Sequence, residues 1–141
     1  MSASTIRTIM GLVFIVHGIG HVMALLPALN ISSTESWHHR SWLLSGILGD
    51  TVSRALVIIL FGAAMIGFIA AGLGLFGWLV PHSAWQTLAV YSAVISLVAL
   101  GLFWNAFAAL FPNKIGSIVV NVFTLWALLG SGTYPEMIQN L

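Results

Sequence analysis

Residues 8–29 read TIMGLVFIVHGIGHVMALLPAL, and no Asp, Glu, Lys or Arg interrupts them. A helix that crosses the hydrocarbon core of a bilayer needs about 20 predominantly apolar residues, so this stretch predicts a membrane span. Its only ionisable side chains are His17 and His21, whose spacing places them on one face of a helix. Ionisable groups at that depth usually face the interior of a helix bundle. The stretch therefore predicts a membrane helix with a polar site inside it.

The composition extends this interpretation to the whole chain. Of the 141 residues, 60% are hydrophobic and 5% are charged, and the mean hydropathy is +1.07, whereas soluble domains carry about 25% charged residues. No charged residue lies between Ala55 and Asn113, a block too long for one span but sufficient for two. We expect a single all-α membrane domain with four transmembrane helices. The expected spans are about residues 8–29, 55–78, 85–111 and 115–132.

The connections between these spans predict how the helices are arranged. Pro81 and His82 separate the second span from the third, and Pro112 separates the third from the fourth. Connections this short favour antiparallel neighbours, so we expect an up-down bundle. The first loop, residues 30–54, is longer and holds most of the charged side chains. Within it, residues 37–44 (WHHRSWLL) predict a short amphipathic segment at the membrane surface or in the mouth of the bundle. We therefore expect the first loop to be partly helical.

Small residues recur every fourth position on the first two spans. They are Gly20, Ala24 and Ala28 on the first span, and Ala63, Gly67 and Ala71 on the second. Such patterns let helix backbones approach closely in lipid. His17 and His21 share a face with Ala24 and Ala28, which predicts that both histidines point into the bundle.

Polar residues on the other spans are expected to meet these histidines. At 1.5 Å per residue, His21 lies about 12 Å from the first-loop face, and Asn105 and Asn121 lie about 9 Å from the same face. Tyr91 shares a helical face with Asn105. We therefore expect His17, His21, Asn105, Asn121 and Tyr91 to line one pocket that opens toward the first loop.

The residues leave three uses of such a pocket open. Its side chains can join the helices by hydrogen bonds of about 0.6 to 2 kcal/mol each, as in a ligand-free structural subunit of a larger complex. They can also bind a ligand or form a proton path, and neutral histidine and asparagine suit the carbonyls of a quinone head group. Alternatively, in a metal-dependent membrane enzyme or carrier, His17 and His21 can hold a divalent metal, with His38 and His39 of the first loop as further ligands.

Other functional classes are excluded by the composition. A net charge of +1 with no basic cluster argues against a nucleic-acid partner. The absence of cysteine excludes disulfides, thiolate metal sites and thiol redox chemistry. No phosphate-binding loop or serine–histidine–acid set is present, so hydrolase and kinase activities have no support. The bilayer is the expected partner, and the sequence leaves open both catalysis and membership of a homo-oligomer or larger complex.

Several short motifs occur in an order that resembles a known family. They are His17-Gly18-x-x-His21, residues 68–73 (FIAAGL), Ser96-Leu97 followed by Phe103-Trp104, and Ile115-Gly116 followed by Asn121. Together they resemble the small four-span bacterial membrane proteins of the DoxX-like kind, specifically the HG-x-x-H group. The resemblance implies a four-helix bundle in the bacterial inner membrane. Some DoxX relatives are quinone-linked subunits of sulfur-compound oxidation.

Overall fold

The computed structural model describes residues 2–130 and 132–141 and is built from helices. Its elements are α1 (Ala3–Gly20), α2 (Val22–Ala28), α3 (Ser45–Leu75), η1 (His82–Ala84), α4 (Trp85–Leu102), η2 (Trp104–Ala106), η3 (Leu110–Lys114), α5 (Ile115–Leu129) and α6 (Thr133–Gln139). Among the described residues the only β pairing is an isolated bridge between Thr34 and Trp37. The predicted all-α class is confirmed.

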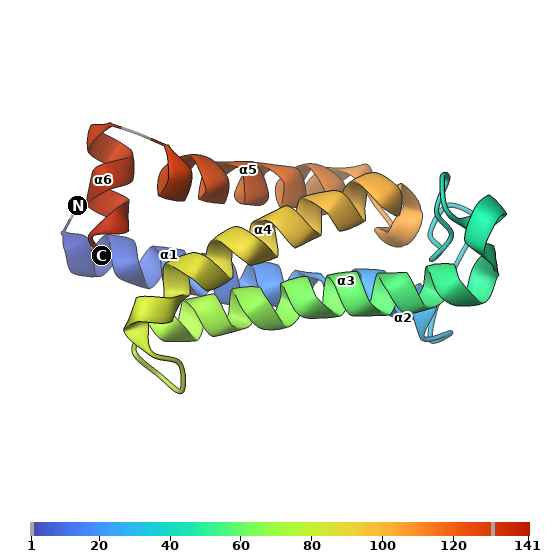
Figure 1. The fold of residues 1–141 in the computed structure, drawn as a ribbon, viewed down its shortest axis with the longest axis horizontal. Coiled ribbons are helices and arrows are strands. Elements are labelled where there is room, and N and C mark those ends of the chain that lie inside the picture. The colour runs from blue at the N-terminus through green and yellow to red at the C-terminus, as the bar shows by residue number, and fades with distance from the viewer. Residues whose placement is uncertain (1, 131) are drawn as a thin grey trace.

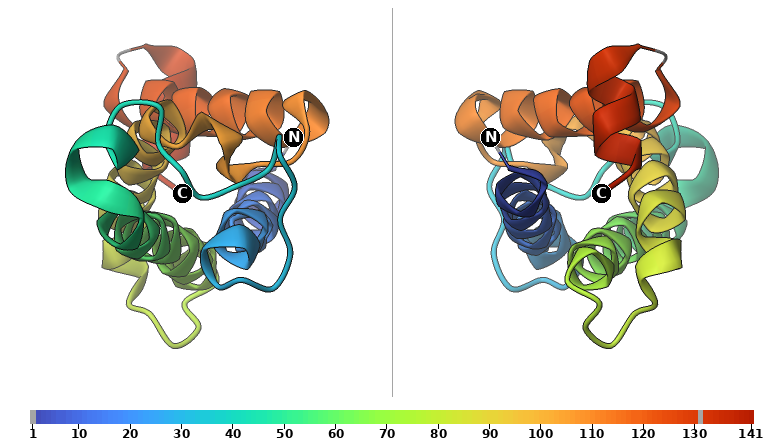
Figure 2. Two further views of the ribbon diagram at one scale, coloured as in Figure 1. Left: turned by 90° about the vertical axis from the view of Figure 1, so that its right-hand side faces the viewer. Right: turned by 90° about the vertical axis from the view of Figure 1, so that its left-hand side faces the viewer.

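Four helical segments are long and apolar enough to cross a membrane, as the sequence predicted. They are Ala3–Ala28, Ser45–Leu75, His82–Leu102 and Leu110–Leu129. Figure 1 shows these segments lying along the long axis of the molecule, with α6 across the end that holds both termini. In the end-on views of Figure 2 they surround a common interior. Neighbours along the chain pack together, α1 on α3, α3 on α4 and α4 on α5.

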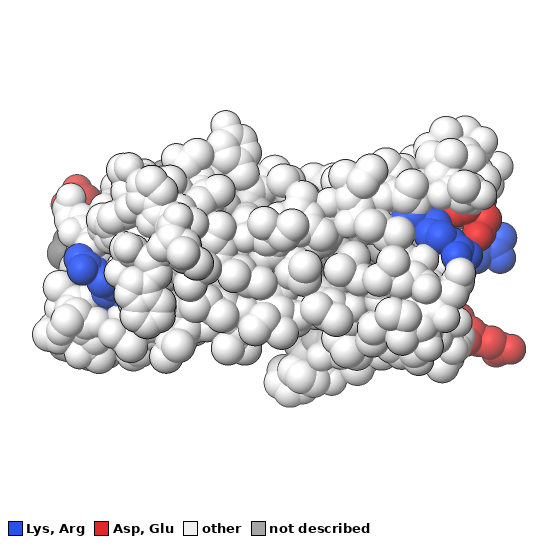
Figure 3. All heavy atoms as spheres, turned by 90° about the horizontal axis from the view of Figure 1, so that it is seen from below, with Lys and Arg blue, Asp and Glu red and all other residues white. Residues whose placement is uncertain are grey.

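The surface is apolar along the middle of the molecule and charged at its ends. Large side chains such as Val16, Ile66 and Leu129 are more than half exposed. On the face drawn in Figure 3, the Lys, Arg, Asp and Glu side chains lie only at the two ends, and the region between them is uncharged. This distribution is the reverse of that of a soluble protein, whose charged groups cover the surface.

The third helix ends earlier than the sequence predicted. Residues 103–111 were expected to continue the span, but α4 ends at Leu102 and is followed by the short helix η2 and a non-helical stretch before η3. Phe103, Ala106 and Phe107 fold inward and are buried. The hydropathy of this segment is the same whether it is helical or folded back, so composition could not reveal the change.

Side chains of the first loop bind the carbonyl groups that the end of α4 leaves free. Ser41 Oγ donates to the carbonyl of Leu102 at 2.6 Å, and Trp42 Nε1 donates to that of Gly101 at 2.8 Å. Such partners are required because the last carbonyls of a helix have no partner within it. Residues 37–44 therefore cap α4 from turns and irregular backbone. The loop is helical only from Ser45, and Gly49 interrupts that helix with a φ of 79°.

Trp37 connects the first loop to α2 and to the segment that follows α4. Its indole Nε1 donates to the carbonyl of Met23 at 3.1 Å and to that of Ala106 at 2.9 Å. The Met23 carbonyl would bind the N–H four residues later in a regular helix, but that residue is Pro27, which has none. Trp37 replaces the missing donor.

Close contact between α1 and α3 depends on glycines other than those predicted. A Cβ on Gly18 would lie 2.9 Å from the carbonyl oxygen of Met65, and one on Gly72 would lie 2.7 Å from that of Gly11. Of the predicted small residues, Ala24, Ala28 and Ala71 are buried, and Gly67 packs against Ser92 of α4. Ala63 is exposed, and a Cβ on Gly20 would meet nothing within 4 Å. Only some of the small residues predicted to recur at helix contacts therefore lie at such contacts.

We predict that Gly72→Ala lowers the free energy of unfolding by about 1 to 3 kcal/mol, because its methyl group would press on the backbone of α1. Gly62→Ala is the matched control, since it lies in the same helix and its Cβ would meet nothing within 4 Å. That substitution should be neutral or stabilising by up to about 1 kcal/mol. Thermal unfolding in detergent, followed by circular dichroism, compares the two. Equal melting temperatures for both variants would contradict the close packing of α1 on α3.

Candidate functional site

A break between α1 and α2 positions the two histidines. The backbone N–H of His21 donates to the carbonyl of Gly18 at 3.0 Å, one residue short of the regular helical partner. The carbonyl of His17 is thereby left for a side chain, and His21 Nδ1 lies 2.9 Å from it. Because a carbonyl oxygen only accepts, His21 must carry its proton on Nδ1.

The remaining hydrogen bonds follow from this one proton. In a neutral ring, His21 Nε2 is then an acceptor, so it takes the hydroxyl proton of Ser96 at 2.8 Å. Since Ser96 has only one proton, its Oγ must accept from Asn121 Nδ2, also at 2.8 Å. Asn121 Oδ1 therefore faces His17, whose Nε2–H donates to it at 3.2 Å. The donors form a closed circuit from His17 through Asn121, Ser96 and His21 back to the His17 carbonyl.

This circuit joins three helices and is almost completely enclosed. His21 is 1% exposed, and Ser96 and Asn121 are 0% exposed. Asn121 Nδ2 also lies within hydrogen-bond distance of Ser117 Oγ, at 3.3 Å. Among the described residues, no buried side-chain nitrogen or oxygen lacks a partner. The cost of burying these polar groups is therefore offset by their hydrogen bonds.

Aromatic rings surround the two imidazoles. Phe68 lies edge-on to His17, with ring centroids 4.7 Å apart, and the two histidine rings are themselves 4.8 Å apart in a T-shaped arrangement. Phe61 and Phe107 lie near His21, with ring centroids 5.9 and 6.1 Å from that of its imidazole. These contacts pack both imidazoles against aromatic rings on the inner side of the site.

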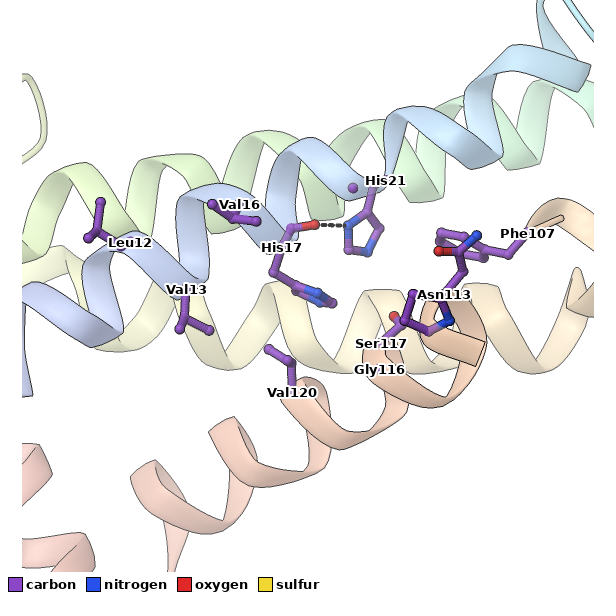
Figure 4. Close-up of a pocket in the computed structure, with 12 residues that line it drawn as sticks. Leu12, Val13, Val16, His17, His21, Phe107, Asn113, Gly116, Ser117 and Val120 are labelled. Atoms are coloured by element: carbon purple, nitrogen blue, oxygen red, sulfur yellow. Dashed lines mark hydrogen bonds between the residues drawn. The ribbon is translucent and has the colours of Figure 1, made fainter. Parts of the chain in front are cut away.

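A groove of about 440 Å³ lies beside the circuit, between α1 and α5. Figure 4 shows His17 pointing into it from α1, with Ser117 and Val120 opposite on α5 and Leu12 and Val13 toward one end. The complete lining comprises Leu12, Val13, Val16, His17, Gly20, His21, Phe107, Pro112, Asn113, Gly116, Ser117 and Val120. Most of this surface is apolar, and its polar atoms come chiefly from the histidines, Asn113 and Ser117.

One ring nitrogen of His17, Nδ1, is available to bind a ligand in this groove. Nε2 is bonded to Asn121, and among the described residues no hydrogen-bond partner is present for Nδ1. Because every buried side-chain nitrogen in the described residues has a partner, Nδ1 must be accessible from the surface. The His17 side chain points into the groove (Figure 4), so the groove is where a ligand could meet Nδ1. With the proton on Nε2, the neutral ring presents a lone pair at Nδ1.

The structure brings together three of the five residues expected to form one pocket. His17, His21 and Asn121 meet, whereas Tyr91 is 65% exposed on α4. Asn105 lies beyond the end of α4, where its side-chain amide is 3.4 Å from His38 Nε2. The depth and phase calculated for Asn105 assumed a continuous helix as far as residue 111, and that assumption fails after Leu102.

Ser96 completes the circuit but was not among the expected site residues. Ser92 and Ser96 are four residues apart on α4, and both are buried. A pair of hydroxyls at this spacing on an apolar helix marks a face that contacts neighbouring helices. That spacing was the available signal.

The further metal ligands expected from the first loop do not reach the site. His39 Nε2 donates to Asp50 at 3.0 Å, and His38 lies beside Asn105. Burial, followed by the neighbouring His39 and Arg40, lowers the pKa of His38, which favours the neutral form of this ring. Within the described residues no group of three or more His, Cys, Asp or Glu is placed to hold a metal ion. Both nitrogens of His21 are already bonded, which leaves His17 Nδ1 as the only free imidazole nitrogen of the pair.

No protein-family model, curated protein or solved structure matches the chain. The function is therefore inferred from the geometry of the site and from the groove beside it.

We predict that Asn121→Leu lowers the free energy of unfolding by about 1 to 3 kcal/mol, because Ser96, Ser117 and His17 each lose a partner. Tyr91→Phe is the control, since the Tyr91 side chain is exposed on a neighbouring helix. It should change stability by less than about 0.5 kcal/mol. Thermal unfolding of both variants in the same detergent tests this. A melting temperature for Asn121→Leu as high as that of Tyr91→Phe would show that the circuit contributes nothing to stability.

Proposed function

We propose that this chain is a multi-pass integral membrane protein whose four long helices cross the bilayer as an up-down bundle. The lengths and apolar character of the four segments support this, as does the confinement of charged side chains to the ends on the face shown in Figure 3. We also propose that the protein resides in the bacterial inner membrane and belongs to the DoxX-like HG-x-x-H group. The motif behind that resemblance, His17-Gly18-x-x-His21, lies at the centre of the site.

We further propose that the protein is a binding or accessory subunit that holds the head group of a lipophilic ligand, such as a quinone. The groove between α1 and α5 carries this proposal because it combines an apolar surface with a few polar atoms. Ligand sites are typically clefts of about 300 to 1,000 Å³ with this composition. Leu12, Val13 and Val16 suit an alkyl or isoprenoid tail, and His17 and Ser117 suit its polar end.

The hydrogen-bond circuit supports a binding role over a proton path. A proton relay requires groups that accept a proton at one atom and release another. The side-chain amide of Asn121 lies between His17 and Ser96 and does not ionise in this way. The circuit instead fixes the position and the protonated atom of each imidazole, which is the requirement for recognising a ligand in one orientation.

A ligand-free structural subunit is the second candidate, and the closure of the circuit favours it. Every buried polar side-chain atom of the described residues already has a partner, so the circuit itself needs no ligand. This role explains the packing of α1, α4 and α5. It gives no reason for the groove or for the accessible Nδ1 of His17.

Filling the groove tests the proposal. Gly20 lines it, and a Cβ there would meet nothing within 4 Å, so Gly20→Leu places a side chain in the open space without a backbone clash. The protein is embedded in phosphatidylcholine nanodiscs and titrated with a decyl-substituted 1,4-benzoquinone by isothermal titration calorimetry. We predict that Gly20→Leu raises the Kd by about tenfold or more, the equivalent of about 1.4 kcal/mol.

Gly62→Leu is the matched control, because Gly62 has equally open space and does not line the groove. Its Kd should equal that of the wild type. Equal binding by both variants would place any quinone site elsewhere. If the wild type binds neither this quinone nor the corresponding quinol, and extraction of the purified protein yields no lipophilic molecule, the ligand-free structural subunit is the correct assignment.

A further inference from the structure

We propose that the groove recognises its ligand through a hydroxyl group that donates a hydrogen bond to His17 Nδ1. A hydroxylated ring, such as the quinol form, is then preferred over the corresponding carbonyl compound. This inference rests on the proposed function, since it specifies which chemical form the same groove selects.

The direction of the hydrogen bonds in the circuit determines this preference. The His17 carbonyl can only accept, which assigns in turn the protons of His21, Ser96, Asn121 and His17. The result places the His17 proton on Nε2 and leaves a lone pair at Nδ1. A ligand carbonyl, which also has only lone pairs, would be repelled there, whereas a hydroxyl has the proton that Nδ1 lacks.

The surroundings of His17 favour the neutral ring on which this assignment depends. The acidic residues of the chain are Glu35, Asp50 and Glu136, and none of them lines the groove or joins the circuit. Phe68 and the second imidazole pack against the ring instead. A positive charge placed among these groups would be costly because no anion compensates it.

The shape of the groove limits the rest of the ligand. His17, Ser117 and Asn113 supply polar atoms in the middle and at the end next to Phe107, and Leu12 and Val13 extend the groove in the other direction (Figure 4). The ligand class is therefore a ring alcohol or phenol with an apolar tail. Ser117 and Asn113 add polar contacts around the head group, while the proton-accepting position is His17 Nδ1.

A chemically stable pair of probes isolates the hydroxyl. Wild-type protein in phosphatidylcholine nanodiscs is titrated with 4-decylphenol and with its methyl ether, 4-decylanisole, which has the same ring and tail but no donor. We expect the phenol to bind about three to ten times more tightly, as one neutral hydrogen bond provides. In Gly20→Leu, both probes should bind more weakly.

Substitution of His17 tests whether the preference arises at that residue. His17→Phe keeps a ring against Phe68 but removes both nitrogens, so the phenol should lose its advantage over the ether. His39→Phe is the control, because His39 is bonded to Asp50 and lies outside the groove. If His17→Phe does not fold, Asn121→Leu replaces it, because the loss of Asn121 releases the His17 proton from Nε2 and should also reduce the preference.

The outcomes separate this inference from the proposed function. Equal wild-type affinities for phenol and ether, with both weakened by Gly20→Leu, would overturn hydroxyl recognition and leave the groove as a binding site. A preference that persists in His17→Phe would also overturn it. Failure of both probes to bind to the wild type would overturn the proposed function together with this inference.

Discussion

The hydrogen bond from His21 Nδ1 to the main-chain carbonyl of His17 determines the chemistry of the rest of the site. It forms because α1 breaks at His21, whose own N–H turns to Gly18 and leaves that carbonyl free. A carbonyl accepts and never donates, so one backbone atom assigns the protons of four side chains. The same interaction ties the HG-x-x-H motif to Ser96 on α4 and Asn121 on α5. A local irregularity in one helix thereby organises contacts among three.

The other irregular regions follow the same requirement, that each backbone polar group removed from water has a partner. Pro27 removes a donor from α2, and the indole of Trp37 replaces it. The end of α4 frees the carbonyls of Gly101 and Leu102, and Trp42 and Ser41 bind them. The polar first loop is thus a set of caps for the apolar helices. These caps hold the folded-back segment around Phe107 against the groove.

The sequence predicted those features of the fold that depend on composition and on regular helical periodicity. The uncharged stretches gave four apolar helices, and the spacing of His17 and His21 predicted an inward-facing pair. The features that it did not reveal depend on the residue at which a helix ends. Residues 103–111 are as apolar as a continuing helix, so the assumed phase of Asn105 was wrong, and Tyr91, assigned to the same face, is exposed. Ser96 was not assigned to the site, because its spacing from Ser92 and its place in the Ser96-Leu97 motif do not indicate contact with the histidines. The groove depends on how α1 and α5 diverge, which no local pattern encodes.

The circuit fixes one protonated nitrogen on each histidine of the pair. Nitrogen-15 NMR of the imidazole rings, with His17→Phe and His21→Phe used to assign the signals, measures this directly in the intact protein near neutral pH. We predict that both rings are neutral, with the His17 proton on Nε2 and the His21 proton on Nδ1. A proton on Nδ1 of His17, a proton on Nε2 of His21, or a doubly protonated ring at either position would contradict the circuit.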